Sequence, residues 1–145
     1  MGSETPAGRE LLDEALAFAL ENFTSSEAAG LLYMRFEAHR CLAVVRVMRG
    51  ELNEAETLCA AASDIVSRTE SRVSQLWLGP LYLYILLAVA RKLKLENKPD
   101  QAATKINLAK ELLGPYQQLV AECQSPNFVR EAERLERELS QNRQQ

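Results

Sequence analysis

The sequence contains few residues that interrupt helices and few aromatic side chains. Its 145 residues include six Gly and five Pro, and Phe, Trp and Tyr together make up 6% of the chain. With Ala and Leu abundant, this composition favours helices over β structure. A chain of this length buries one continuous core without disulfides or metals to hold it together. We therefore expect a single all-α domain over residues 1–145.

Cysteine and histidine are also scarce, which excludes several kinds of site. Cys41, Cys59 and Cys123 are odd in number and form no Cys-x-x-Cys motif, so a disulfide scaffold is not expected. His39 is the only histidine, and a metal cluster or catalytic arrangement that uses several histidines is therefore excluded. Residues two apart on a helix point to different faces. We expect His39 to be a partly exposed helix residue that does not activate Cys41.

Glycine clusters that hold phosphate groups are missing as well. Gly30, Gly50, Gly79 and Gly114 are isolated from one another, whereas a phosphate-binding loop needs several glycines at close spacing. The acidic residues at 13–14 and 131–133 fall on ordinary solvated faces. We expect no enzyme activity, no cofactor and no bound metal.

The charge of the chain restricts its partners and its location. A net charge of −3 and a pI near 5.3 give no overall attraction to nucleic acid or to an anionic membrane. The acidic, polar start of the chain lacks the basic segment of a signal peptide. Together with the cysteine usage, this predicts a reducing intracellular compartment, cytoplasmic or nuclear.

The longest apolar run, residues 76–90, is short for a membrane span and contains Gly79-Pro80. A span needs about 20 apolar residues, so we expect none. A helix that is apolar almost all round is usually packed on several sides, which predicts a buried helix in the middle of the fold. The alternative is that one side stays open as an adhesive patch.

A short pattern occurs twice in the chain, 47 residues apart. The residues that correspond are, in order, Gly50 and Asn97, Leu52 and Pro99, Ala55 and Ala102, Cys59 and Ile106, and Ala62 and Ala109. Self-similarity at a spacing of some tens of residues is typical of stacked repeats. Such arrays usually work by presenting a surface to a partner.

The periodicity of apolar residues and the positions of capping residues predict six helical segments. They cover about residues 6–23, 26–49, 52–68, 99–123 and 126–141, and a further segment starts between residues 71 and 80 and ends near 96. The segment at 99–123 is expected to break at Gly114-Pro115. Ser25 or Ser26 is expected to cap the second segment, and Gly50 to end it in the left-handed conformation. The first segment has apolar residues that we place on one side: Leu11, Leu12, Ala15, Leu16, Ala19 and Phe23.

The last segment has the clearest pattern. Its apolar residues fall on one stripe at helical spacing: Phe128, Val129, Ala132, Leu135 and Leu139. The other faces carry Glu and Arg at spacings that permit ion pairs along the helix. A helix with one apolar face and one charged, solvent-exposed face is what the end of a repeat array requires, so we predict a terminal capping helix at residues 126–141.

The repeated segment resembles the second half of a tetratricopeptide repeat (TPR), whose turn reads Gly-x-[Leu/Tyr/Pro]-x-x-Ala. The turn and small-residue positions of the family are matched by Gly50, Leu52, Ala55 and Ala62, and again by Asn97, Pro99, Ala102 and Ala109. Leu42-Ala43 and Val89-Ala90 fill the positions of the family's Leu-Gly pair. The family's aromatic positions are not matched, and the spacing of 47 exceeds its usual 34. The resemblance covers about residues 30–115 and implies antiparallel helical hairpins at 31–66 and 81–113.

Asp13-Glu14-Ala15 echoes the same turn about 40 residues before Ala55. If it marks the second helix of a repeat, the first helix of that repeat is missing. Either the chain is part of a longer array, or its opening helix is a cap.

One group of basic residues stands out in this acidic chain. At about 100° per residue, Arg35, His39, Arg46 and Arg49 fall within one narrow stripe, with Arg40 beside it. The planar guanidinium donates two parallel hydrogen bonds to a carboxylate or phosphate. In some TPR domains a basic groove holds the acidic C-terminus of a client, and the resemblance implies a similar site here. The alternative is a solvated face whose arginines pair with acids of a neighbouring helix, such as Glu54 or Glu56.

We expect a scaffold or adaptor module that binds a segment of another protein within a larger assembly. The alternative is a homo-oligomerisation domain joined through the apolar fourth helix or the last helix. A ligand- or nucleic-acid-sensing domain is less favoured, because the chain is acidic and has no phosphate motif. The expected partner is a protein, with an acidic segment as the first candidate.

Overall fold

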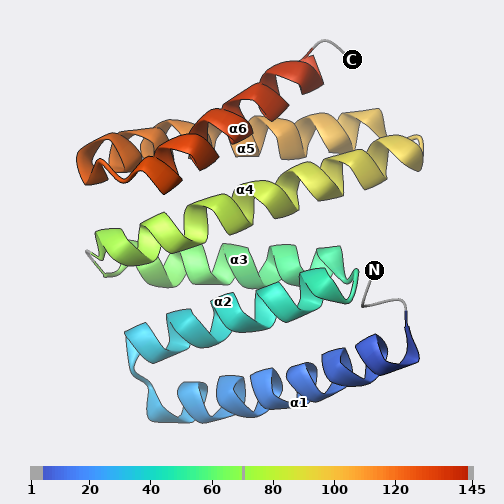
Figure 1. Ribbon diagram of the computed structural model, residues 1–145, viewed down its shortest axis with the longest axis vertical. Helices are drawn as coiled ribbons and strands as arrows, with labels where there is room; N and C mark the ends of the chain where they lie inside the picture. Colours follow the sequence, from blue (N-terminus) through green and yellow to red (C-terminus); the bar gives the residue numbers. More distant parts are fainter. Residues whose placement is uncertain (1–4, 70, 144–145) are drawn as a thin grey trace. The chain divides into compact units, whose positions relative to one another are not determined.

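The protein was analysed as a computed structural model, which describes residues 5–69 and 71–143. Over these ranges the chain forms six helices and no strand, so the predicted all-α fold is confirmed (Figure 1). The helices are α1 (Pro6–Ala29), α2 (Leu32–Met48), α3 (Leu52–Ser67), α4 (Arg72–Leu95), α5 (Pro99–Cys123) and α6 (Pro126–Arg143). They form two compact units, Met1–Glu70 and Ser71–Gln145. The single domain expected over residues 1–145 stays a prediction.

In the first unit, α1 packs on α2 and α2 packs on α3, with each helix antiparallel to the next (Figure 1). The side chain of Thr5 caps α1 by accepting from the amide of Gly8 at 2.9 Å, and Pro6 opens the helix. The break predicted at residues 24–26 is wrong. The hydroxyl of Thr24 donates to the Leu20 carbonyl at 3.0 Å, and α1 continues until Gly30, which adopts φ 70°.

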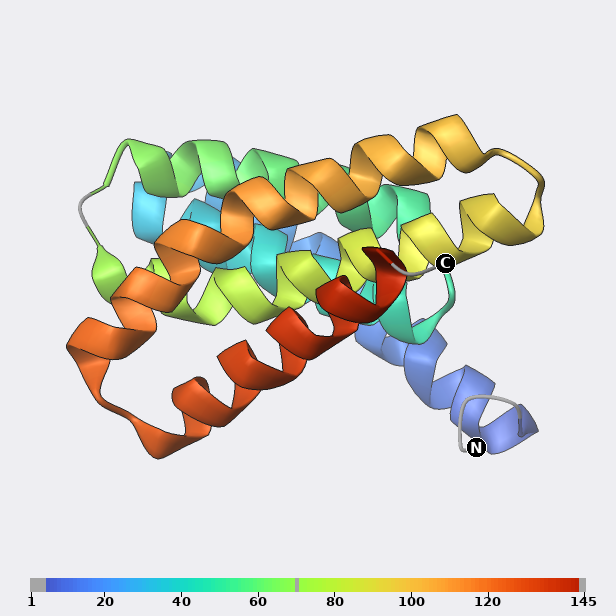
Figure 2. The same cartoon turned by 90° about the horizontal axis from the view of Figure 1, so that it is seen from above.

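In the second unit, α4 and α5 form a hairpin, and α6 packs on both of them. Figure 2 shows α6 turning back from the end of α5 and running alongside α4. The break predicted at Gly114-Pro115 is wrong, since α5 is continuous through both residues. Both are exposed, as is Glu111, whose carbonyl loses its amide partner at Pro115. The unpaired carbonyl thus belongs to an exposed residue, and the helix continues past it. Pro80 likewise lies inside α4.

Two turns 47 residues apart have the same backbone geometry. Gly50 and Asn97 have φ values of 79° and 59°. The amide of Glu51 donates to the Arg46 carbonyl at 2.8 Å, and that of Lys98 to the Leu93 carbonyl at 2.9 Å. In each turn this bond, with one from the left-handed residue to the carbonyl three before it, forms a Schellman motif. The left-handed C-cap predicted at Gly50 is therefore confirmed.

Small residues occupy corresponding positions in the two hairpins and are fully buried. The buried alanines are Ala43, Ala55 and Ala62 in the first hairpin, and Ala90, Ala102 and Ala109 in the second. A small side chain lets two helix backbones approach closely, so these positions set the spacing of α2 from α3 and of α4 from α5. The hairpins predicted at residues 31–66 and 81–113 are both present and antiparallel.

The α4–α5 hairpin has a second close contact, between Gly79 and Tyr116. A Cβ atom on Gly79 would lie 2.6 Å from Cδ2 of Tyr116, so only glycine admits the ring at this point. The Tyr116 hydroxyl is buried, and no hydrogen-bond partner for it is found among the described residues. Burial raises the pKa of Tyr116 to about 12.

Candidate protein-interaction surfaces

The arginines predicted to bind a partner all lie on α2, and two of them bond to α1. Nε of Arg35 donates to Oε1 of Glu27 at 3.1 Å. Arg49, at the C-cap of α2, donates to the carboxylate of Asp13. These contacts join both ends of α2 to α1. They give Arg35 and Arg49 a role within the first unit.

Arg46 and Arg49 also converge on one carboxylate at the turn. Nη1 of Arg46 lies 2.7 Å from Oε2 of Glu51, and Nε of Arg49 lies 2.6 Å from Oε1. The hydrogen bond from Arg49, with the charge of Arg46, lowers the pKa of Glu51. Hydrogen bonds to Asp13 and Glu51 raise the pKa of Arg49. The site is therefore an internal ion-pair cluster around the turn at Gly50.

Arg40 pairs with Glu37 on the same helix. Its Nη2 and Nε atoms bond the two carboxylate oxygens at 2.9 and 3.2 Å, and this side-chain hydrogen bond raises the pKa of Arg40. Each arginine of the predicted stripe thus has a carboxylate partner within the chain. Two of these acids, Asp13 and Glu27, lie on the neighbouring helix α1, whereas the sequence suggests Glu54 or Glu56 of the following helix. A segment of another protein would have to replace the paired acids to bind here, and the partner site itself stays a prediction.

His39 does not lie on an exposed face of α2. The expectation of a partly exposed histidine is wrong, because the side chain is buried. Its ring packs on Phe23 of α1 with centroids 4.6 Å apart, and Nδ1 lies 2.6 Å from the Arg35 carbonyl oxygen. The extra length of α1 brings Phe23 over this part of α2. His39 belongs to the packing between α1 and α2.

The face of α4 that remains open is mainly apolar, with one charged residue, Arg91, between Tyr84 and Leu95. Val73, Trp77, Tyr84 and Leu95 are exposed and recur at helical spacing. Trp77 is 56% exposed although one edge of its ring contacts Phe128 of α6, with ring centroids 5.9 Å apart. Both expectations for this helix thus hold in part, since most of the apolar run at residues 76–90 is buried and one side of the helix is open.

Among the described residues, α4 is the one helix long and apolar enough to cross a membrane. In the 18-residue window that meets this test, 56% of the residues are buried inside the protein. A buried core helix of a water-soluble protein passes the same test. Its length and composition are therefore weak evidence for a span.

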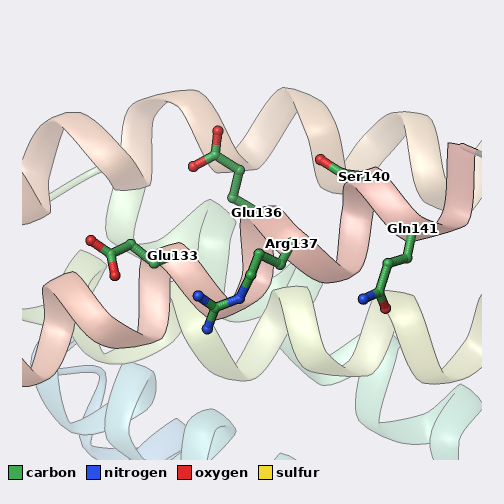
Figure 3. Close-up of a pocket in the computed structure, with 5 residues that line it drawn as sticks. All are labelled: Glu133, Glu136, Arg137, Ser140 and Gln141. Carbon is green, nitrogen blue, oxygen red and sulfur yellow. The ribbon is translucent and has the colours of Figure 1, made fainter.

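The outer surface of α6 is polar. Figure 3 shows an open depression along it, lined by Glu133, Glu136, Arg137, Ser140 and Gln141. Ala132, Leu135 and Leu139 are buried on the opposite side, whereas Val129 is 36% exposed. All five lining residues belong to this one helix, so the depression is a surface feature of α6. The apolar stripe predicted for this helix is thus buried from Ala132 onward and partly exposed at Val129.

In the part of the chain that the structure describes, no three His, Cys, Asp or Glu side chains are grouped so as to hold a metal ion. All three cysteines are free thiols. Burial raises the pKa of Cys59 to about 12, so its thiol stays protonated, whereas Cys123 is exposed.

Comparisons of the chain with protein families, with curated proteins and with solved structures find no match. The functional argument therefore depends on the geometry of the chain itself.

Proposed function

We propose that the protein is a protein-interaction module, built from two TPR-like hairpins, that binds a segment of another protein. The observation that carries this proposal is the open apolar face of α4. Large apolar patches are rare on soluble monomers and usually mark interaction sites. Trp and Tyr, both present on this face, are the residue types most often found at the energetic centre of interfaces.

The resemblance to TPRs is supported by the matching geometry of the two turns and their buried alanines, whereas the spacing of 47 residues between them departs from the family's usual 34. Gly50 and Asn97 share a left-handed conformation, and Ala55 and Ala102 are both fully buried. Repeats of this kind provide a rigid surface, and side chains that vary between repeats select the partner. An intracellular scaffold or adaptor role is consistent with this arrangement.

The arginines of α2 are the second candidate surface. An acidic segment would have to displace Glu27, Glu37 or Glu51 from partly exposed ion pairs, each worth about 0–1 kcal/mol. Displacing such an acid therefore costs little free energy, but the new ion pair with the partner would also contribute little to the free energy of binding. Because the arginines are already paired within the chain, they are better suited to holding α1 on α2 than to increasing the affinity for a partner.

Self-association remains the alternative function. The exposed face of α4 is the surface suited to it, because the outer surface of α6 is polar. Sedimentation over a range of protein concentrations distinguishes the two functions. A monomer throughout the range favours the proposed module, and a dimer lost on substitution of α4 favours self-association.

The test of the proposed function is capture of partners from native lysate with matched variants. Tyr84→Ser with Leu95→Ser removes apolar surface from α4 and leaves the Trp77–Phe128 contact in place. Met48→Ser is the control, because Met48 corresponds to Leu95 in the first hairpin and is also exposed. A protein retained by the wild type and by Met48→Ser but lost by the α4 variant supports the proposal. Identical capture by all three contradicts it.

The arginine surface is tested in the same assay with Arg35→Glu and Arg46→Glu combined. Binding is assigned to α2 if this variant no longer captures the partner while its helical signal and melting temperature are retained, and if added salt also abolishes capture by the wild type. A fall in melting temperature shows instead that the arginines act within the fold.

A further inference from the structure

Helix α1 has two apolar sides, and only one of them is covered. Leu12 and Ala19 are buried on the side that packs on α2. Leu11 and Phe18 are 66% and 73% exposed. The prediction that Leu11 shares a side with Leu12 is therefore wrong.

The open side is a regular stripe about a quarter turn from the buried one. Leu11, Ala15 and Phe18 are separated by four and three residues, so at about 100° per residue they align along the helix. This is the spacing by which one helix presents apolar residues to another. We call these three residues the α1 stripe.

A row of carboxylates borders the α1 stripe. Glu10, Glu14 and Glu21 are all exposed and recur at the same helical spacing. Among the described residues they form no ion pair, in contrast to Asp13 and Glu27 of the same helix. Arg9, the one basic residue of α1, falls on neither border of the stripe but beyond the buried side of the helix. The stripe is therefore apolar with one acidic border.

Helix α6 presents a different outer surface from that of α1. Its outer surface mixes Glu133 and Glu136 with Arg137, and Leu135 and Leu139 are buried on the inner side. Its opposite charges pair along the helix, as in Arg134 with Glu131 and Glu138. The outer side of α1 carries charges of one sign, Glu10, Glu14 and Glu21, beside the exposed Leu11 and Phe18.

We propose that the α1 stripe docks an amphipathic helix of another protein whose apolar face is bordered by Lys or Arg. Leu11 and Phe18 would supply the apolar contact, and the row of Glu10, Glu14 and Glu21 would pair with the basic border. Charge complementarity selects this occupant. The proposal concerns a surface separate from α4 and does not depend on partner binding there.

A second copy of the chain fits the same stripe poorly. In an antiparallel pair of α1 helices, the two rows of glutamates would lie side by side, and like charges at close range disfavour association. A parallel pair would align the two helix dipoles. A basic helix avoids the repulsion between the glutamate rows.

The experiment measures binding of a designed peptide to the full chain by fluorescence anisotropy. The peptide is a labelled helix of about five turns, with Leu at helical spacing and Lys on both borders. A second peptide carries Glu in place of every Lys. The proposal expects the Lys peptide to bind, its affinity to fall with added salt, and the Glu peptide not to bind.

Matched variants locate the binding. Leu11→Ser with Phe18→Ser should weaken the Lys peptide about tenfold or more, because each lost apolar contact is worth over a factor of ten when fully buried. Glu10→Gln, Glu14→Gln and Glu21→Gln together keep the apolar residues and should remove the preference for the Lys peptide. Tyr84→Ser with Leu95→Ser should bind as the wild type does.

Three results would overturn the proposal. They are equal affinity of the wild type and the Leu11→Ser, Phe18→Ser variant, no binding of the Lys peptide, and a wild-type dimer that Phe18→Ser dissolves. The last result would assign the stripe to a second copy. The substituted residues are exposed, so the helical signal should be unchanged. If it is not, the glutamine variant decides by its selectivity between the two peptides.

Discussion

The hairpins α2–α3 and α4–α5 are alike where backbones meet and different where side chains face outward. Both turn through a left-handed residue, and both bury alanine at the same three positions. The differences begin with His39, which is buried against Phe23, while Leu86 at the corresponding position is an ordinary core residue. Backbone conformation and close contact restrict residue type strongly, whereas the remaining positions are free to change.

The ion pair beside each turn illustrates this freedom. In the first hairpin Arg49 pairs with Glu51 at 2.6 Å, and at the corresponding positions of the second Lys98 lies 3.7 Å from Glu96. The signs of the two charges are exchanged, yet the turn is the same. The turn therefore depends on φ at Gly50 and Asn97 and not on a particular charge at its flanks.

The largest effects are expected where both hairpins bury alanine. Ala55→Leu and Ala102→Leu should each lower the free energy of unfolding by about 1–3 kcal/mol, because the added methyl groups overpack a closed helix contact. Chemical denaturation followed by circular dichroism measures this. Ala60→Leu and Ala103→Leu are the controls, since both alanines are exposed on the same helices. If the buried and exposed variants unfold alike, the shared register of the hairpins is wrong.

A contact found only in the second hairpin separates it from the first. Gly79→Ala should cost about 1–3 kcal/mol, because its Cβ would meet the Tyr116 ring. Tyr116→Phe should leave stability unchanged or raise it by about 1 kcal/mol, since it removes a buried hydroxyl that has no partner among the described residues. Thermal and urea unfolding of both variants test this. A clear loss of stability in Tyr116→Phe would show that the hydroxyl is bonded in solution.

Removing glycine from one turn and introducing it into the other should affect stability differently. Gly50→Ala should cost about 1 kcal/mol, because alanine is strained at positive φ. Asn97→Gly should be neutral or slightly stabilising, since Asn adopts this conformation with less strain than other side chains. Urea midpoints of the two variants give the comparison. Equal destabilisation by both changes would mean that the turns are not equivalent.

The smallest effect concerns the ion pairs and depends on pH. The pKa of Glu51 is lowered in the folded state, so its contribution to stability is present above the unfolded pKa of about 4.3. That contribution is lost as the pH falls through the folded pKa. Glu51→Gln should therefore melt slightly below the wild type at neutral pH, and the difference should vanish in acid. A difference that persists in acid would point to packing instead of charge.

The sequence predicts the parts of the fold that local chemistry determines. Gly50 ends α2 as expected, because a left-handed C-cap favours glycine. Ala55 and Ala102 were recognisable from their repeated spacing. The break expected at Pro115 does not occur, because the carbonyl deprived of its amide partner lies at an exposed residue, and that exposure is set by tertiary packing.

The candidate surfaces were harder to predict for the same reason. Glu27 and Asp13, which pair with Arg35 and Arg49, are on α1, and their positions follow from where α1 ends and how it packs on α2. Phe18 was not singled out, although its spacing from Leu11 is visible in the sequence. Periodicity shows which residues share a face, but not which of two apolar faces a neighbouring helix covers.

NMR measurement of the two turns in solution tests most directly the claim that both hairpins share one register. The account predicts positive φ at both Gly50 and Asn97. It also predicts hydrogen-bond couplings from the amides of Glu51 and Lys98 to the carbonyls of Arg46 and Leu93. A negative φ at Asn97, or a missing coupling to Leu93 while that to Arg46 is observed, would contradict it.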